Sequence, residues 1–168
     1  VVLDKLHLAN GVAMGPEGDY VLVNQTLGFC VTRLWLKGPK AGQSEPFVPS
    51  LPGGPDNITY NGKDTYWVAL AYPRFPRLEA LASQPFKKKL MMRFPRFLAL
   101  VPEFFNGLNL PTFGLLVGVD MDGNITHFMD AKDSSIGMVT SVLEHEGHLY
   151  LGSLMSDYIA RIPVPEPV

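Results

Sequence analysis

The sequence predicts an all-β protein, a β-propeller of about three blades with a partly helical insert at residues 75–111. Three segments carry the prediction, because each is a glycine-containing turn followed by a strand of aromatic, β-branched or leucine residues: "GPEGDYVLVNQT", "TYNGKDTYWVAL" and "LEHEGHLYLGSL". Tyr20 and Tyr66 are 46 residues apart. Tyr66 and Leu149 are 83 apart, which is again 46 once the 37 residues of the insert are left out. A period in the forties is typical of propeller blades, whereas an all-β sandwich lacks one.

Each segment contributes one blade, and we expect Tyr20–Val23, Tyr66–Ala69 and Leu149–Gly152 to be corresponding inner strands of four-stranded antiparallel blades. Further candidate strands follow, as in "VTRLWLKG" and "YIARIPVP". Three blades do not close a ring, and an open array leaves unpaired strand edges. Because the chain begins abruptly with "VVLDKLHLANG", we expect a partial propeller domain over residues 1–168, the C-terminal part of a longer one. The alternative is that two copies complete one another.

The segment between the second and third repeats differs in kind. Residues 75–111 combine lysines and arginines with phenylalanine, leucine and methionine, and their prolines limit helices to short pieces near Leu78–Ser83 and Phe86–Phe94. A basic amphipathic insert of this type suits an anionic membrane surface. We favour the plainer alternative, a lid over the propeller mouth, because the prolines interrupt any long amphipathic face.

The amino-acid composition limits the classes of protein and of partner that fit this chain. The chain has 168 residues, of which 46% are hydrophobic and 18% charged, as in globular domains. A net charge of −2 argues against nucleic acid as the main partner. The single cysteine, Cys30, stands among apolar neighbours, which predicts a buried and inert thiol. Three sequons begin at Asn24, Asn57 and Asn124, and they matter only in a secreted chain.

The stretch "LPGGPDNITY" places an acid and an amide, Asp56 and Asn57, directly after two glycines and a proline. One interpretation is an Asx-turn where the chain enters a strand. The other is a pair of hard oxygen ligands, which suits calcium. Asn10 stands in a similar place before Gly11, where a turn residue is again the alternative. Asn10 lies ten residues before Tyr20 and Asp56 ten before Tyr66, so the repeat predicts equivalent places on adjacent blades.

Several motifs resemble the strictosidine synthase-like family, and particularly its adipocyte plasma membrane-associated group. They are "ANGVAMGPEGDYVLVNQT", "VTRLWLKGPKAGQSEPFV", "LPGGPDNI", "YWVAL" and "EHEGHLYLGSL", which occur in family order over nearly the whole chain. The resemblance implies a six-bladed propeller of the calcium-dependent phosphotriesterase superfamily, together with paraoxonases and gluconolactonases. This chain would then be its C-terminal half. It also implies membrane association or the secretory pathway.

In metal-dependent relatives, carboxylate and amide side chains from several blades hold a central calcium. By the resemblance, the ligands here are Asn10, Asp56 and Asn57. Calcium takes six to eight oxygens, so water or the missing half of the propeller must supply the rest. The residue that matches the catalytic glutamate of true strictosidine synthases is Thr140, and a hydroxyl cannot replace a carboxylate as base near neutral pH.

The resemblance therefore implies a calcium-dependent hydrolase of esters or lactones, whose partner is a small-molecule substrate. Calcium would polarise the carbonyl, and Asp56 is the candidate catalytic residue, as base, although a carboxylate engaged with calcium is a weak one. Two alternatives remain open. One is a non-catalytic, membrane-associated binding propeller. The other is the strictosidine-type condensation, against which Thr140 counts.

Overall fold

The described residues of this computed structural model are 1–74, 114–131 and 136–168, and every regular element among them is a β-strand. The predicted all-β class is therefore confirmed. The expected insert at residues 75–111, with its helices near Leu78–Ser83 and Phe86–Phe94, lies outside the described residues. No helix in the described ranges is long and apolar enough to cross a membrane.

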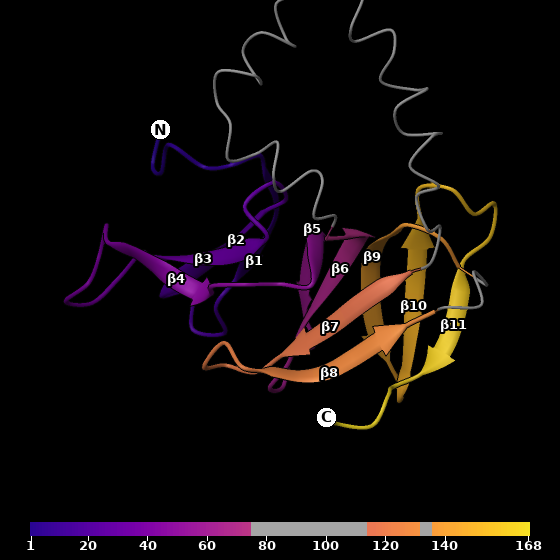
Figure 1. The fold of residues 1–168 in the computed structure, drawn as a ribbon. Helices are drawn as coiled ribbons and strands as arrows, with labels where there is room; N and C mark the ends of the chain where they lie inside the picture. Colours follow the sequence, from indigo (N-terminus) through magenta and orange to yellow (C-terminus); the bar gives the residue numbers. More distant parts are fainter. Residues whose placement is uncertain (75–113, 132–135) are drawn as a thin grey trace, which may run out of the picture. The chain divides into compact units, whose positions relative to one another are not determined.

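The strands form three consecutive antiparallel sheets (Figure 1). The first sheet has the order β1-β2-β3-β4 and the second β5-β6-β7-β8, whereas the third has three strands, β11-β10-β9. The expectation of four strands per blade therefore holds for two of the three sheets in the described part of the chain. Their bounds are β1 Ala9–Met14, β2 Tyr20–Gln25, β3 Cys30–Trp35, β4 Ser44–Val48, β5 Gly53–Tyr60, β6 Tyr66–Pro73, β7 Leu115–Val119, β8 Ile125–Asp130, β9 Val139–His145, β10 His148–Ser153 and β11 Ala160–Pro163.

Strand β6 shows why an uninterrupted apolar run forms a strand here. Successive side chains of a strand point to opposite faces. Tyr66, Val68 and Leu70 join the core between the first two sheets, whereas Trp67 and Ala69 join a second core with the third sheet. All five are buried. Strand β6 is thus covered on both faces, which explains its lack of polar alternation.

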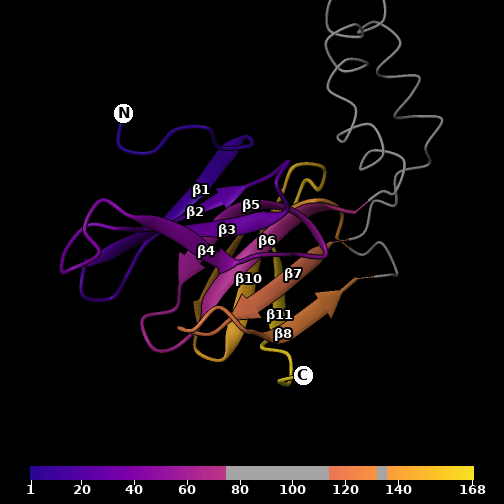
Figure 2. The ribbon, with the colours of Figure 1, turned by 60° about the vertical axis from the view of Figure 1, so that its left-hand side comes forward.

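The predicted inner strands require a correction. Tyr20–Val23, Tyr66–Ala69 and Leu149–Gly152 do correspond, because they lie in β2, β6 and β10, each second in its sheet. The edge strands β1, β5 and β9 instead meet between sheets, with β1 beside β5 (Figure 2) and β9 beside β5 and β6. In β2 and β6 the aromatic pattern marks burial on both faces, whereas β10 alternates buried and half-buried residues.

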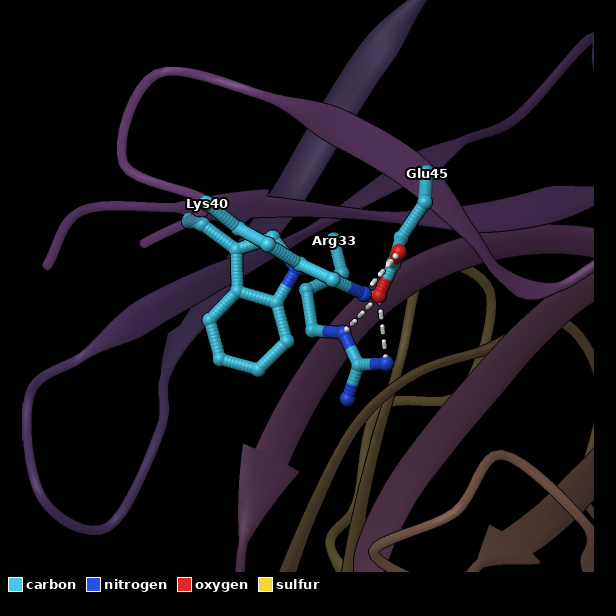
Figure 3. A network of polar contacts seen from close by, with 4 residues as sticks. Arg33, Lys40 and Glu45 are labelled. Carbon is cyan, nitrogen blue, oxygen red and sulfur yellow. Dashed lines mark hydrogen bonds and ion pairs between the residues drawn. The ribbon is translucent and has the colours of Figure 1, made fainter. Parts of the chain in front are cut away.

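The first sheet carries a cluster of charges around Glu45. The carboxylate accepts hydrogen bonds from Arg33 Nη2 at 2.6 Å and from Lys40 Nζ at 2.9 Å (Figure 3). Trp35 Nε1 donates to it as well, at 3.0 Å. The hydrogen bonds from Lys40, Arg33 and Trp35 lower the pKa of Glu45 to about 2. The guanidinium of Arg33 also lies 4.6 Å from the centre of the Trp35 ring, so the cluster ties β3 to β4 and to the loop between them.

Cys30, expected to be buried, opens β3 and is half-buried.

Candidate functional site

The edge strands β1 and β5 carry the same irregularity at matching places. In the first sheet Ala9 pairs with Gln25, but Val12 pairs with Val23, so β1 has one extra residue at Asn10-Gly11. In the second sheet Pro55 pairs with Leu70 and Ile58 with Val68, so β5 has one extra residue at Asp56-Asn57. One extra residue on one strand of an antiparallel pair is a β-bulge, which bends the strand and redirects its side chains.

Strand β9 repeats the feature. Ser141 pairs with Gly152 and Val139 with Ser153, so Thr140 is the extra residue. Its hydroxyl donates to the Gly152 carbonyl oxygen, 3.5 Å away. The position that the sequence identified as the missing catalytic carboxylate therefore lies at a bulge equivalent to those of Asn10 and Asp56, and it carries a hydroxyl.

The three bulges are in contact. A side chain at Gly11 would place its Cβ within 2.6 Å of Asn57 Cα and of the Asp56 carbonyl oxygen, so only glycine permits this approach of β1 to β5. On the other side, Asn57 Nδ2 donates to the carbonyl oxygen of Thr140 at 2.7 Å. A continuous row of bulges thus crosses the edges of all three sheets.

Two buried side chains, one at the end of β2 and one directly after it, satisfy carbonyls at the β5 bulge. Asn24 Nδ2 donates to the Asp56 carbonyl oxygen at 2.9 Å, and Thr26 Oγ1 donates to that of Pro55 at 2.7 Å. The Thr26 hydroxyl also accepts a hydrogen bond from Asn10 Nδ2 at 3.2 Å. Asn24 and Thr26 were not among the predicted site residues, although the polar residues that end the otherwise apolar run "YVLVNQT" were an available signal.

Asp56 does not lie in a turn. One interpretation of the sequence is an Asx-turn where the chain enters the strand, but "GGPDN" belongs to β5. The bulge allows glycines and a proline to lie at a sheet edge. Burial raises the pKa of the half-buried Asp56 carboxyl, and a hydrogen bond from the Asn10 side chain acts in the opposite direction. The fold has therefore partly desolvated a carboxylate and placed an amide beside it.

The structure joins two of the three predicted ligands directly, Asn10 and Asp56. Asn57, the third, is exposed and bonds through its nitrogen to the next sheet. Both asparagines donate through Nδ2, so each has its amide oxygen available as a hard ligand. No group of three or more His, Cys, Asp or Glu side chains gathers in the described residues. One carboxylate with amide oxygens is a donor set that fits calcium.

Away from the bulges, the edge strands carry exposed apolar side chains. Val12, Met14 and Leu143 are exposed, although each lies between buried or half-buried neighbours in its strand. A hollow of about 650 Å³ follows β1 and β5 toward their hairpin turns, and its lining includes Val12, Met14 and Tyr60. The surroundings of the polar row are thus largely apolar.

Glu144 in β9 accepts hydrogen bonds from Trp67 Nε1 at 2.7 Å and from Asn61 Nδ2 at 3.0 Å. The carboxylate thus links the second and third sheets. Glu146, in the turn that follows β9, is exposed beside Gly147.

Comparison with known proteins gives consistent relatives. The chain is 35% identical over 193 aligned residues to the adipocyte plasma membrane-associated protein Hemomucin of Drosophila melanogaster, covering 99% of this chain and 33% of that protein. It is 34% identical to the adipocyte plasma membrane-associated protein of Rattus norvegicus and 31% to that of Homo sapiens. Both matches cover 96% of this chain, and they cover 43% and 39% of the two relatives. The chain therefore spans less than half the length of these relatives.

Among solved structures, a gluconolactonase from Xanthomonas campestris aligns with a TM-score of 0.57 at 13% identity, covering 97% of this chain and 40% of that one. This likeness supports the propeller fold. No family model matches the chain. The sequence identity along nearly its whole length places this chain in the strictosidine synthase-like family, among the adipocyte plasma membrane-associated proteins, as part of a β-propeller.

Proposed function

We propose that the whole protein is a calcium-dependent hydrolase of esters or lactones, with Asn10, Asp56 and Asn57 among its calcium ligands. The observation that carries the proposal is the row of bulges, which gathers a partly desolvated carboxylate and two amides at the edges of neighbouring sheets. Desolvation of a carboxylate is costly unless a positive charge compensates it. A bound cation would compensate it here.

The chain's own residues have separate roles in this proposal. Asp56 contributes the negative charge, and Asn10 orients its carboxylate by a hydrogen bond. Asn57 contributes an amide oxygen, while its nitrogen anchors β5 to Thr140. When bound, calcium supplies electrostatic polarisation of a substrate carbonyl. The exposed apolar side chains of Val12 and Met14 suit the apolar part of a small ester.

The gluconolactonase likeness supports this proposal through the fold alone, because fold does not determine function. The Thr140 position argues against the strictosidine-type condensation, since a threonine hydroxyl is not a general base near neutral pH. The remaining ligands are expected from water or from other blades of the whole protein.

An arylesterase and lactonase assay of the whole protein tests the proposal. We expect turnover with calcium, loss of turnover with a chelator, recovery when calcium is restored, and no calcium-dependent turnover in Asp56→Ala. Asn124→Ala, which changes an exposed amide in the β7–β8 turn, is the matched control and should retain activity. Equal activity in Asp56→Ala and in the control would overturn the metal assignment.

A second candidate, a non-catalytic membrane-associated binding propeller, is favoured by the names of the relatives. It predicts calcium-dependent stability without turnover of any ester or lactone. Co-sedimentation of the whole protein with anionic vesicles, compared with neutral vesicles, tests its membrane contact through residues 75–111.

A further inference from the structure

Asn24 in β2 and Thr26 directly after β2 are buried polar residues that reach the neighbouring sheet. Asn24 has no exposed surface and Thr26 is 6% exposed. Both donate hydrogen bonds to backbone carbonyl oxygens of β5, at Asp56 and at Pro55 respectively. Gln25, between them in the chain, bonds elsewhere: to the His7 backbone nitrogen and to the Thr32 hydroxyl.

The bulge explains why these two carbonyls need side-chain donors. Regular ladder pairing of β5 with β6 is interrupted between Pro55 and Ile58, and buried backbone carbonyls are costly when they remain unpaired. Across the second sheet, the residue opposite the bulge is Ala69, whose side chain offers no donor. The donors therefore come from the preceding sheet.

Packing alone does not account for Asn24. Its second amide atom, Oδ1, is buried and has no hydrogen-bond partner among the described residues. A leucine of similar size would avoid that penalty, because burial of an unpaired polar atom is unfavourable. Burial of the Asn24 side chain is thus unfavourable at Oδ1, whereas Nδ2 is useful because it holds the Asp56 backbone.

Thr26 links the two predicted ligands. Its hydroxyl donates to the Pro55 carbonyl and accepts from the Asn10 amide, and Asn10 in turn bonds to the Asp56 carboxylate. Thr26, directly after β2, therefore supports the acidic bulge at its backbone and, through Asn10 of β1, at its side chain.

We propose that Asn24 and Thr26 are positioning residues for the Asp56 carboxylate, which they hold in place for cation binding by fixing the β5 bulge from the neighbouring sheet. This inference rests on the calcium site of the proposed function. Hydrogen-bonded residues behind metal ligands commonly change metal affinity by about 10–100-fold when they are replaced.

The test is the calcium dissociation constant of the whole protein, measured by isothermal titration calorimetry, together with the melting temperature in chelator. Asn24→Leu and Thr26→Val keep side-chain size but remove the donors. We expect each to weaken calcium binding by about tenfold or more. Thr26→Ser retains the hydroxyl and should bind calcium like the wild type. Gln25→Leu removes a buried amide of the same strand, and it should lower the melting temperature without changing the dissociation constant.

Two outcomes overturn the inference in distinguishable ways. If the wild type binds calcium and Asn24→Leu and Thr26→Val bind it equally well, the two residues have a structural role only, and the proposed function stands. If the wild type takes up no calcium, the proposed function fails and the inference falls with it. Should Asn24→Leu fail to fold, Asn24→Ser and the Thr26 pair of variants carry the same comparison.

Discussion

Asn57 on β5 and Thr140 on β9 are 83 residues apart in the chain, yet Asn57 Nδ2 lies 2.7 Å from the carbonyl oxygen of Thr140. Each residue is at the bulge of its strand. A bulge carbonyl that turns away from its own sheet is available to a donor of the next one. This hydrogen bond therefore aligns two neighbouring sheets at the level of the candidate site.

Replacement of Asn57 by alanine should remove this alignment. The variant loses the hydrogen bond to the Thr140 carbonyl, and because Asn57 is exposed, we expect a loss of about 0.5–1.5 kcal/mol in the free energy of unfolding. Urea denaturation of the variant and of the wild type in chelator measures it. Gln43→Ala, which truncates an exposed amide just before β4, should cost less. Equal losses in both variants would show that the cross-sheet bond contributes nothing.

Asp56→Asn should separate the charge of the carboxylate from its shape. Burial raises the pKa of Asp56 in the folded state, so the folded protein holds this proton more tightly than the unfolded chain. The stability that this proton contributes is present below the pKa of Asp56 in the unfolded chain, and it is lost as the pH rises through the pKa of Asp56 in the folded protein. In chelator at pH 7, Asp56→Asn should therefore melt at or above the temperature of the wild type, and this advantage should vanish in acid.

Calcium should reverse that order. A metal that binds only the folded state stabilises it by about 2.7 kcal/mol at a concentration one hundred times its dissociation constant. The wild type should gain this stability and Asp56→Asn should not. Thermal melting with and without calcium gives the comparison, and equal calcium-induced shifts in both proteins would contradict the ligand role of Asp56.

Glu45→Gln should have a pH-dependent effect on the first sheet. Hydrogen bonds from Lys40, Arg33 and Trp35 lower the pKa of Glu45 to about 2, so its contribution is present above the unfolded value and is lost as the pH falls toward 2. The variant should melt below the wild type at pH 7, and the difference should shrink below about pH 4.5. Glu17→Gln, in the β1–β2 turn, is the charge-matched control. A difference in melting temperature between Glu45→Gln and the wild type that stays constant with pH would contradict the stabilising role of these hydrogen bonds.

The three sequons should differ in their capacity for glycosylation. Asn24 is fully buried, and a glycan there is incompatible with the fold, whereas Asn124 is exposed in the β7–β8 turn. Its Nδ2 donates to Asp120 at 2.9 Å, and a glycosylated amide retains one N–H for that bond. When the chain is expressed through a eukaryotic secretory pathway, we expect a glycan at Asn124. Loss of the glycosidase-sensitive mobility shift in Asn124→Gln, but not in Asn57→Gln, would show it.

The sequence predicted the repeated sheets because turns and strands have local signatures. Hairpin turns are indicated by "EGDY", "GKDT" and "HEGH". The strands that begin at Tyr20, Tyr66 and His148 start at or directly after these turns. The sequence did not identify the edge strands. "ANGVAM" is largely exposed, so it lacks the run of buried apolar residues by which a strand is recognised.

The candidate site was predicted in its residues but not in its geometry. Asn10 and Asp56 were expected at equivalent places, and they do lie at equivalent bulges. A bulge depends on which residues pair across two strands, and that information is absent from either strand alone. For the same reason the roles of Asn24 and Thr26 became visible only when β2 was placed beside β5.

The pairing of Leu70 with Leu115 has an evolutionary consequence. Strands β6 and β7 are hydrogen-bonded neighbours, so the long stretch of chain between them departs from and returns to adjacent points of one sheet. The entropic cost of closing such an excursion grows only with the logarithm of its length, about 0.6 kcal/mol for each doubling. Selection can therefore lengthen, shorten or rewrite this stretch in different lineages while the ancestral sheet beneath it stays intact.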